Sequence, residues 1–235
     1  YAAGAYTYQN FAFTGVEKVD IATGATLTLS ATQIANDNTF ALSGSGALKI
    51  EGNLSGAGTG TGVASTIDLS GITRASGVTA TVTVTGSSKA DTITGTSGND
   101  TIKASAGADV IVGGDGTDTY DASAFGNLSS GVQVEGASAG TMYGVVINLG
   151  STAVSNTAVL AATGLYTADS LTSVAAGTVA YEFSASGSTN SAVVQSISGI
   201  ETVIGTSGKD YIVAGSAGNT IIGGAGADTM TGGAG

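Results

Sequence analysis

Residues 86–121 read GSSKADTIT GTSGNDTIK ASAGADVIV GGDGTDTYD, which are four consecutive segments of nine residues. Each segment has aspartate in its sixth position and a large apolar or aromatic residue in its eighth. The sixth positions are Asp91, Asp100, Asp109 and Asp118, and the eighth positions are Ile93, Ile102, Ile111 and Tyr120. Repetition at a short fixed period predicts a stacked structure in which every segment occupies an equivalent place.

A second array of the same form begins at Gly205 and reads GTSGKDYIV AGSAGNTII GGAGADTMT GGAG. Its sixth positions are Asp210, Asn219 and Asp228, and its eighth positions are Ile212, Ile221 and Met230. Two turns depart from the pattern, because GSSKAD lacks glycine in its fourth position and AGSAGN carries Asn219 in place of aspartate. We expect these two turns to bind a ligand more weakly than the turns that keep the full pattern.

The composition of a segment explains its length. Glycine tolerates positive φ angles, so the first six positions can form a tight turn, and the last three form a short strand. Side chains alternate along a strand, so the eighth position points inward when the seventh and ninth point outward. Two segments then make one coil, and segments n and n+2 stack. The expected stacked pairs are Asp91 with Asp109, Asp100 with Asp118, and Asp210 with Asp228.

A ladder of stacked carboxylates needs a cation. Neighbouring rungs are about 4.8 Å apart, and two carboxylates at that distance repel by roughly 3 kcal/mol at an effective dielectric of about 20. Calcium accepts about six to eight oxygen ligands, from carboxylates and backbone carbonyls alike. The sequence therefore predicts Ca2+ between the stacked turns. The predicted ligand positions are Asp91, Asp100, Asp109, Asp115, Asp118, Asp210, Asn219, Asp228, Gly95, Gly113, Gly205 and Gly223. The alternative is that the aspartates form strand-capping turns without metal, as Asp-Gly and Asn-Gly sequences often do.

The remaining sequence is typical of short strands. Segments such as VEKVDI, ATLTLSA, ALKIEG and TATVTVTG before the first array, and GVQVEG, GVVINLG and VAYEFSAS after it, alternate and are separated by Gly, Ser or Asn. Only residues 153–176 have helical potential, and Gly164 and the β-branched residues weaken it. We predict an all-β protein, a right-handed parallel β-roll or β-helix. Four parts are expected: a strand-rich segment at 1–85, the first array at 86–121, a β-rich excursion at 122–204 and the second array at 205–235.

Composition excludes several classes of function. The chain has no His and no Cys, so it offers no catalytic triad and no thiol nucleophile. Its net charge is -11 with only six Lys and Arg, which argues against nucleic acid as a partner. No apolar run is long enough for a membrane span. The chain opens without Met or a basic leader and closes inside another segment, so we expect it to be a piece of a longer protein.

The two arrays resemble the glycine-rich nonapeptide repeats of the RTX, or hemolysin-type calcium-binding, family. The resemblance implies a parallel β-roll with Ca2+ between turns, and secretion of an unfolded chain that folds outside the cell. Together with the Gly/Ser/Thr/Ala-rich β segments, the chain looks like bacterial surface-layer (S-layer) proteins with such repeats. We therefore expect a calcium-dependent structural module, not an enzyme, of an exported surface protein. Its expected partners are copies of itself, other surface-protein domains or a cell-surface polysaccharide. The alternatives are a folding and secretion module of a type I-secreted adhesin, toxin or hydrolase, and a carbohydrate-active β-helix enzyme.

Overall fold

The computed structural model describes residues 5–7, 14–52, 64–74, 77–123, 125, 144–163, 172–183 and 191–233. The chain divides into two compact units, Tyr1–Thr119 and Tyr120–Gly235. The expected strand GVQVEG lies outside the described residues. Nearly all of the described elements are strands, and most of their pairings are parallel, which confirms the predicted all-β, parallel fold.

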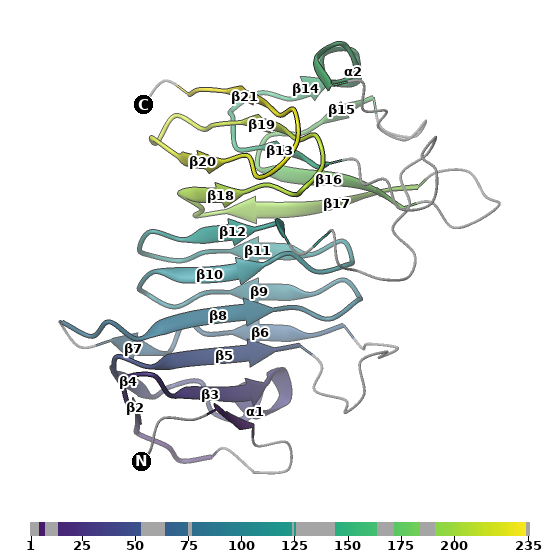
Figure 1. The fold of residues 1–235 in the computed structure, drawn as a ribbon. Coiled ribbons are helices and arrows are strands. Elements are labelled where there is room, and N and C mark those ends of the chain that lie inside the picture. The colour runs from purple at the N-terminus through teal and green to yellow at the C-terminus, as the bar shows by residue number, and fades with distance from the viewer. Residues whose placement is uncertain are drawn as a thin grey trace. The chain divides into compact units, whose positions relative to one another are not determined.

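The first unit consists of parallel strands and one short helix. Its elements are β1 (Ala5–Thr7), β2 (Lys18–Ile21), β3 (Thr26–Ser30), α1 (Ala31–Asn36), β4 (Ala41–Gly44), β5 (Ala47–Glu51), β6 (Thr66–Asp68), β7 (Thr73–Arg74), β8 (Thr81–Thr85), β9 (Thr92–Thr94), β10 (Asp100–Lys103) and β11 (Val110–Val112). They pair in the orders β1-β3-β5-β8-β10, β6-β9-β11 and β2-β4-β7. Figure 1 shows the stacking of β5, β8 and β10.

The coils of this unit change from three sides to two along the chain. Strands β4, β5 and β6 belong to three different sheets, and so do β7, β8 and β9. In the preceding coil the third side is the helix α1, which packs against β6. Its N-terminus is capped by Ser30, whose side chain accepts from the Gln33 N–H while the Gln33 side chain bonds back to the Ser30 N–H. In the array, successive strands alternate between two sheets, so each coil has two sides.

A thin apolar core runs inside these coils. It contains Leu48 and Ile50 of β5, Val82 and Val84 of β8, and the eighth-position residues of the array, all at most 1% exposed. Ile93 pairs with Ile111, and Ile102 pairs with Val84, in the register of the parallel ladders. The inward orientation of Ile93, Ile102, Ile111, Tyr120 and Ile212 is confirmed by their burial.

The second unit contains the second array and the excursion. Its elements are β12 (Thr119–Asp121), β13 (Val146–Asn148), β14 (Val154–Ser155), α2 (Asn156–Thr163), β15 (Ser173–Val174), β16 (Thr178–Phe183), β17 (Ser191–Ser198), β18 (Thr202–Ile204), β19 (Tyr211–Val213), β20 (Thr220–Ile222) and β21 (Thr229–Thr231). The orders are β12-β18-β20, β21-β19-β13-β16-β17 and β14-β15. Strand β16 is antiparallel to both β13 and β17, whereas β18–β20 and β19–β21 are parallel.

Tyr120 replaces isoleucine in the last eighth position of the first array and brings a hydroxyl into the core. The side chain is fully buried, and its hydroxyl donates to Gln195 Oε1 at 2.5 Å. Gln195, on β17, is also fully buried. The excursion therefore supplies the partner that a buried tyrosine needs.

Two expectations need correction. Among the described residues of 153–176, helix is found in α2, with strands β14 and β15 on either side, and α1 is a helix outside the range where helical potential was expected. Met230 does not face a closed interior, since it is 53% exposed, and Ile221 is only partly buried. Both lie on β20 and β21, the edge strands of their sheets, where no further described rung covers them. Neither described helix is long and apolar enough to cross a membrane.

Candidate metal-binding turns

The sixth-position aspartates stack across coils as predicted. The Asp91 N–H donates to Asp109 Oδ1 at 2.9 Å, and both residues are at most 2% exposed. The equivalent bonds join the Asp100 N–H to Asp118 Oδ1 at 2.8 Å, and the Asp210 N–H to Asp228 Oδ1 at 3.0 Å. Each bond spans 18 residues, which is two segments. The pairing of segments n and n+2 is therefore confirmed.

Several of these carboxylates also close their own turns. Asp100 Oδ2 accepts the N–H of Thr96 at 2.6 Å, and Asp210 Oδ2 accepts that of Thr206 at 2.7 Å. Asp91 Oδ2 accepts the N–H of Ser87 at 2.6 Å. The second position of the segment therefore donates its N–H to the aspartate, a role that the sequence analysis did not predict. The recurrence of Ser or Thr at this position was a signal, because the hydroxyl supplies a second donor to the same carboxylate.

Burial separates the predicted ligands into two groups. Asp91, Asp100, Asp109, Asp118 and Asp210 are at most 2% exposed. Asp228 is partly buried, and Asp115, in the third position of its turn, is exposed. The buried group carries formal negative charge in a place where water cannot reach it freely, so a cation is the natural compensation.

Backbone carbonyls gather at the same turns. A Cβ added to Gly95 would collide with the Gly113 carbonyl oxygen of the next coil and would lie 2.7 Å from Asp100 Oδ2. A Cβ on Gly205 would meet the Gly223 carbonyl oxygen and Asp210 Oδ2 in the same way. First-position glycines therefore let a carbonyl of one coil approach the carboxylate of another.

The donor set suits calcium. Carbonyl and carboxylate oxygens are hard ligands, and Ca2+ accepts several of them in flexible geometry. In the described part of the chain no three acidic side chains cluster together, so backbone carbonyls have to supply much of each coordination shell. The ligand roles of the twelve predicted positions remain predictions, and when bound the ion would neutralise the stacked carboxylates.

The Asn219 turn is satisfied without a charge. Its Oδ1 accepts the Gly215 N–H at 2.7 Å, as an aspartate would, but its Nδ2 donates to the Ile200 carbonyl at 3.0 Å. An amide donor thus occupies the place of the second carboxylate oxygen. This supports the expectation that this turn is a weaker calcium site than its neighbours.

Burial raises the pKa of stacked carboxyl groups in both arrays. Desolvation raises the pKa of Asp109 to about 6, the neighbouring Asp91 charge adds to the rise, and hydrogen bonds from the Asp91 N–H and Ser105 oppose it. Desolvation also raises the pKa of Asp210, where the Asp228 charge again adds to the effect. These carboxyls hold protons more tightly when the protein is folded without metal than when it is unfolded.

Acidification is expected to have opposite effects on the metal-free and the calcium-loaded protein. Between the usual pKa of 3.8 and about 6, Asp109 is protonated when folded and ionised when unfolded. The free energy of unfolding of the metal-free protein should therefore fall as the pH rises through this window. Calcium must displace that proton, so its affinity should rise by up to about tenfold per pH unit over the same window. Urea unfolding in chelator and calcium titration, each at several pH values, measure the two slopes; slopes of equal sign would contradict the assignment.

The fold and these turns together define a calcium-binding parallel β-roll. Residues 85–120 and 199–235 match the family model of the RTX calcium-binding nonapeptide repeat, in four copies. The chain thus carries RTX repeats, and their ligand is Ca2+. No curated protein and no solved structure matches the chain significantly.

Proposed function

We propose that this chain is a calcium-dependent structural module of an exported bacterial surface protein of the S-layer type, which self-assembles at the cell surface. The observation that carries the proposal is the burial of stacked carboxylates in both arrays. Asp109 and Asp118 in one unit and Asp210 in the other are at most 1% exposed. Folding of these coils is therefore linked to the supply of a cation.

The linkage to calcium suits a protein that folds after export. Cytosolic calcium is scarce and extracellular calcium is plentiful, so the arrays would remain unfolded inside the cell and fold outside it. The net charge of -11 expands the metal-free chain by self-repulsion, and three bound ions would offset six of those charges. An extracellular location, secretion by a type I route and assembly on the cell surface all follow from this proposal.

The proposed partners are copies of the same chain, other domains of surface proteins, or a cell-surface polysaccharide. Nucleic acid is not proposed, since six basic residues are too few to follow a phosphate backbone. Insertion into a membrane is not proposed either. A catalytic role is not proposed for the chain, because it has no His or Cys, and its buried array aspartates hold turn and cross-coil hydrogen bonds.

Assembly should depend on calcium. We expect the full chain to form large ordered particles or sheets when calcium is added, and to return to small species in excess chelator. Light scattering followed by electron microscopy of the same sample measures this, with magnesium at equal concentration as the control. A monomer in calcium, with its arrays folded, would refute the S-layer assignment.

That outcome would favour the second candidate, a folding and secretion module of a type I-secreted adhesin, toxin or hydrolase. The repeat match favours this candidate because it concerns the arrays alone, residues 85–120 and 199–235. A carbohydrate-active β-helix enzyme is the third candidate, and it rests on fold analogy only. Turnover of a polysaccharide by the isolated chain would be required to support it.

A further inference from the structure

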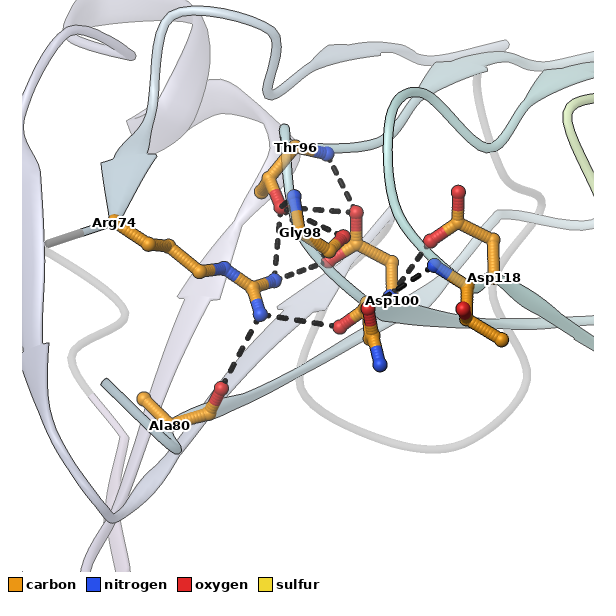
Figure 2. A network of polar contacts seen from close by, with 8 residues as sticks. Arg74, Ala80, Thr96, Gly98, Asp100 and Asp118 are labelled. Atoms are coloured by element: carbon orange, nitrogen blue, oxygen red, sulfur yellow. Dashed lines mark hydrogen bonds and ion pairs between the residues drawn. The ribbon is translucent and has the colours of Figure 1, made fainter. Parts of the chain in front are cut away.

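One basic side chain reaches a buried aspartate of the first array. Arg74, on β7, places Nη2 at 2.6 Å from Asp100 Oδ1, and the two side chains are 12% and 0% exposed. The same nitrogen donates to Thr96 Oγ1 at 2.8 Å, and Nη1 donates to the Asn99 carbonyl at 3.1 Å. Figure 2 shows the guanidinium inserted into the turn that Asp100 closes.

The turn is shaped around this guanidinium. A Cβ on Gly98 would lie 3.1 Å from Arg74 Cζ, so glycine in the fourth position leaves room for the planar group. Guanidinium binds carboxylate and carbonyl oxygens with directed N–H groups, whereas calcium binds the same oxygens as a point charge. The oxygens contacted by Arg74 are of both kinds, a carboxylate oxygen and a backbone carbonyl of one turn.

At other array aspartates, the corresponding carboxylate oxygen meets a different group. Asp91 Oδ1 accepts the backbone N–H of Ser65 at 2.6 Å, and Asp210 Oδ1 accepts that of Val145 at 2.8 Å. These donors are neutral, and they come from the preceding rung of the ladder. At Asp100 the corresponding oxygen is held by a full positive charge instead.

Electrostatics follow the same division. Arg74 opposes the rise in the pKa of Asp100 that burial causes. At Asp109 and Asp210 a neighbouring carboxylate adds to the rise. The charge of Asp100 is thus partly compensated within the protein, on the side that faces away from Asp118.

We propose that Arg74 is a built-in cation at the Asp100 turn, which is the first of the two stacked turns closed by Asp100 and Asp118. Its guanidinium takes the place that calcium holds between later coils. The turn from Thr96 to Asp100 then forms without metal. It presents a finished rung on which the next coil, containing Asp118, is built when calcium arrives. The inference rests on calcium binding by the arrays and is independent of any surface-layer role.

The chain contains its own matched control. Residues 95–100 read GTSGND and residues 205–210 read GTSGKD. Thr96 and Thr206 are each 2% exposed, and Asp100 and Asp210 are 2% and 0% exposed. Both aspartates accept the N–H of the second position at nearly the same distance. The turns differ in the fifth position, which is Asn99 in one and Lys209 in the other. They also differ in the partner of the aspartate Oδ1, which is the Arg74 guanidinium at Asp100 and the Val145 N–H at Asp210.

Hydrogen exchange of the full chain in excess chelator tests the proposal. We expect the amides of Thr96 and Gly98 to exchange about tenfold or more slowly than those of Thr206 and Gly208. In Arg74→Met this difference should disappear without calcium and Thr96 should regain protection when calcium is added. Lys18→Met, which removes an exposed charge from the same sheet, should leave the difference intact.

Equal exchange at the two turns of the wild-type chain in chelator would overturn the proposal, and so would a difference that survives Arg74→Met. Amides of β5 report whether Arg74→Met unfolds the coils below. If it does, Arg74→Lys, which keeps the charge without the fork, replaces it and should give protection between the two extremes. Protection of Thr96 in Arg74→Lys as low as at Thr206 would then count against a role for the charge.

Discussion

Chelation of calcium from the full chain at neutral pH is expected to unfold the second array and the first array from about Asp109 onward, and to leave the earlier coils folded. One ion at about one hundred times its dissociation constant stabilises the fold by about 2.7 kcal/mol, so three ions contribute about 8 kcal/mol. Relief of the repulsion of roughly 3 kcal/mol within each stacked carboxylate pair is already part of this figure. The loss on chelation therefore reaches the range of the whole stability of an ordinary domain, about 5–15 kcal/mol.

The coils below the first array have no comparable dependence. Among the described residues between 14 and 85, the buried polar side chains are Thr28 and Gln33, which are neutral. Their core is built from aliphatic and aromatic side chains such as Phe40, Leu42 and Ile50, none more than 1% exposed. Such a core is stabilised by burial of apolar surface, which chelation does not change.

Circular dichroism and hydrogen exchange in calcium and in excess chelator measure this difference. We expect a partial loss of β signal, with exchange protection lost in both arrays from about Asp109 onward and kept in β3, β5 and β8. Magnesium is the control, because its stricter octahedral geometry and tightly held water make it a poor substitute for calcium here. An unchanged β signal in chelator would contradict the calcium linkage, although it would leave the β-roll fold intact.

The arrays could be predicted because their information is local and repeated. The same residue types recur every nine positions, aspartate in the sixth and an apolar or aromatic residue in the eighth. The stacking of Asp91 on Asp109 and the burial of Ile102 therefore follow from the period and from strand alternation alone. The exposure of Met230 could not be predicted in this way, since a period says nothing about which rung is the last one covered.

The rest of the structure depends on contacts without a period. Helix α1 replaces a strand as one side of a coil, and the antiparallel pairing of β16 with β17 interrupts the parallel ladder. Arg74 is a single residue that meets Asp100 across 26 positions of sequence. The six basic residues are scattered along the sequence, so nothing in the sequence singles out Arg74 as the partner of Asp100. The three-sided coil that precedes the array places Arg74 beside the Asp100 turn.

Replacement of Asp210 by alanine is expected to cause the largest loss of stability of any single substitution in the second array. Its fully buried carboxylate accepts the N–H groups of Val145 and Thr206, which lie in two different coils, and the Thr206 hydroxyl. Alanine would leave these three donors buried without a partner, at about 1–3 kcal/mol each, so we expect a loss of about 3–9 kcal/mol in saturating calcium. Urea unfolding measures it.

Asp210→Asn and Glu17→Ala make the prediction specific. Asparagine keeps an oxygen acceptor but removes the charge, so Asp210→Asn should retain most of the turn and lose calcium affinity, as the native Asn219 turn is expected to do. Glu17 is exposed and lies outside both arrays, so Glu17→Ala should change the free energy of unfolding by no more than about 0.5 kcal/mol. Calcium titration of the three variants separates the two roles of the carboxylate. If Asp210→Ala were as stable as Glu17→Ala, the carboxylate would neither hold the turn nor serve the ion, because either role alone requires a measurable loss.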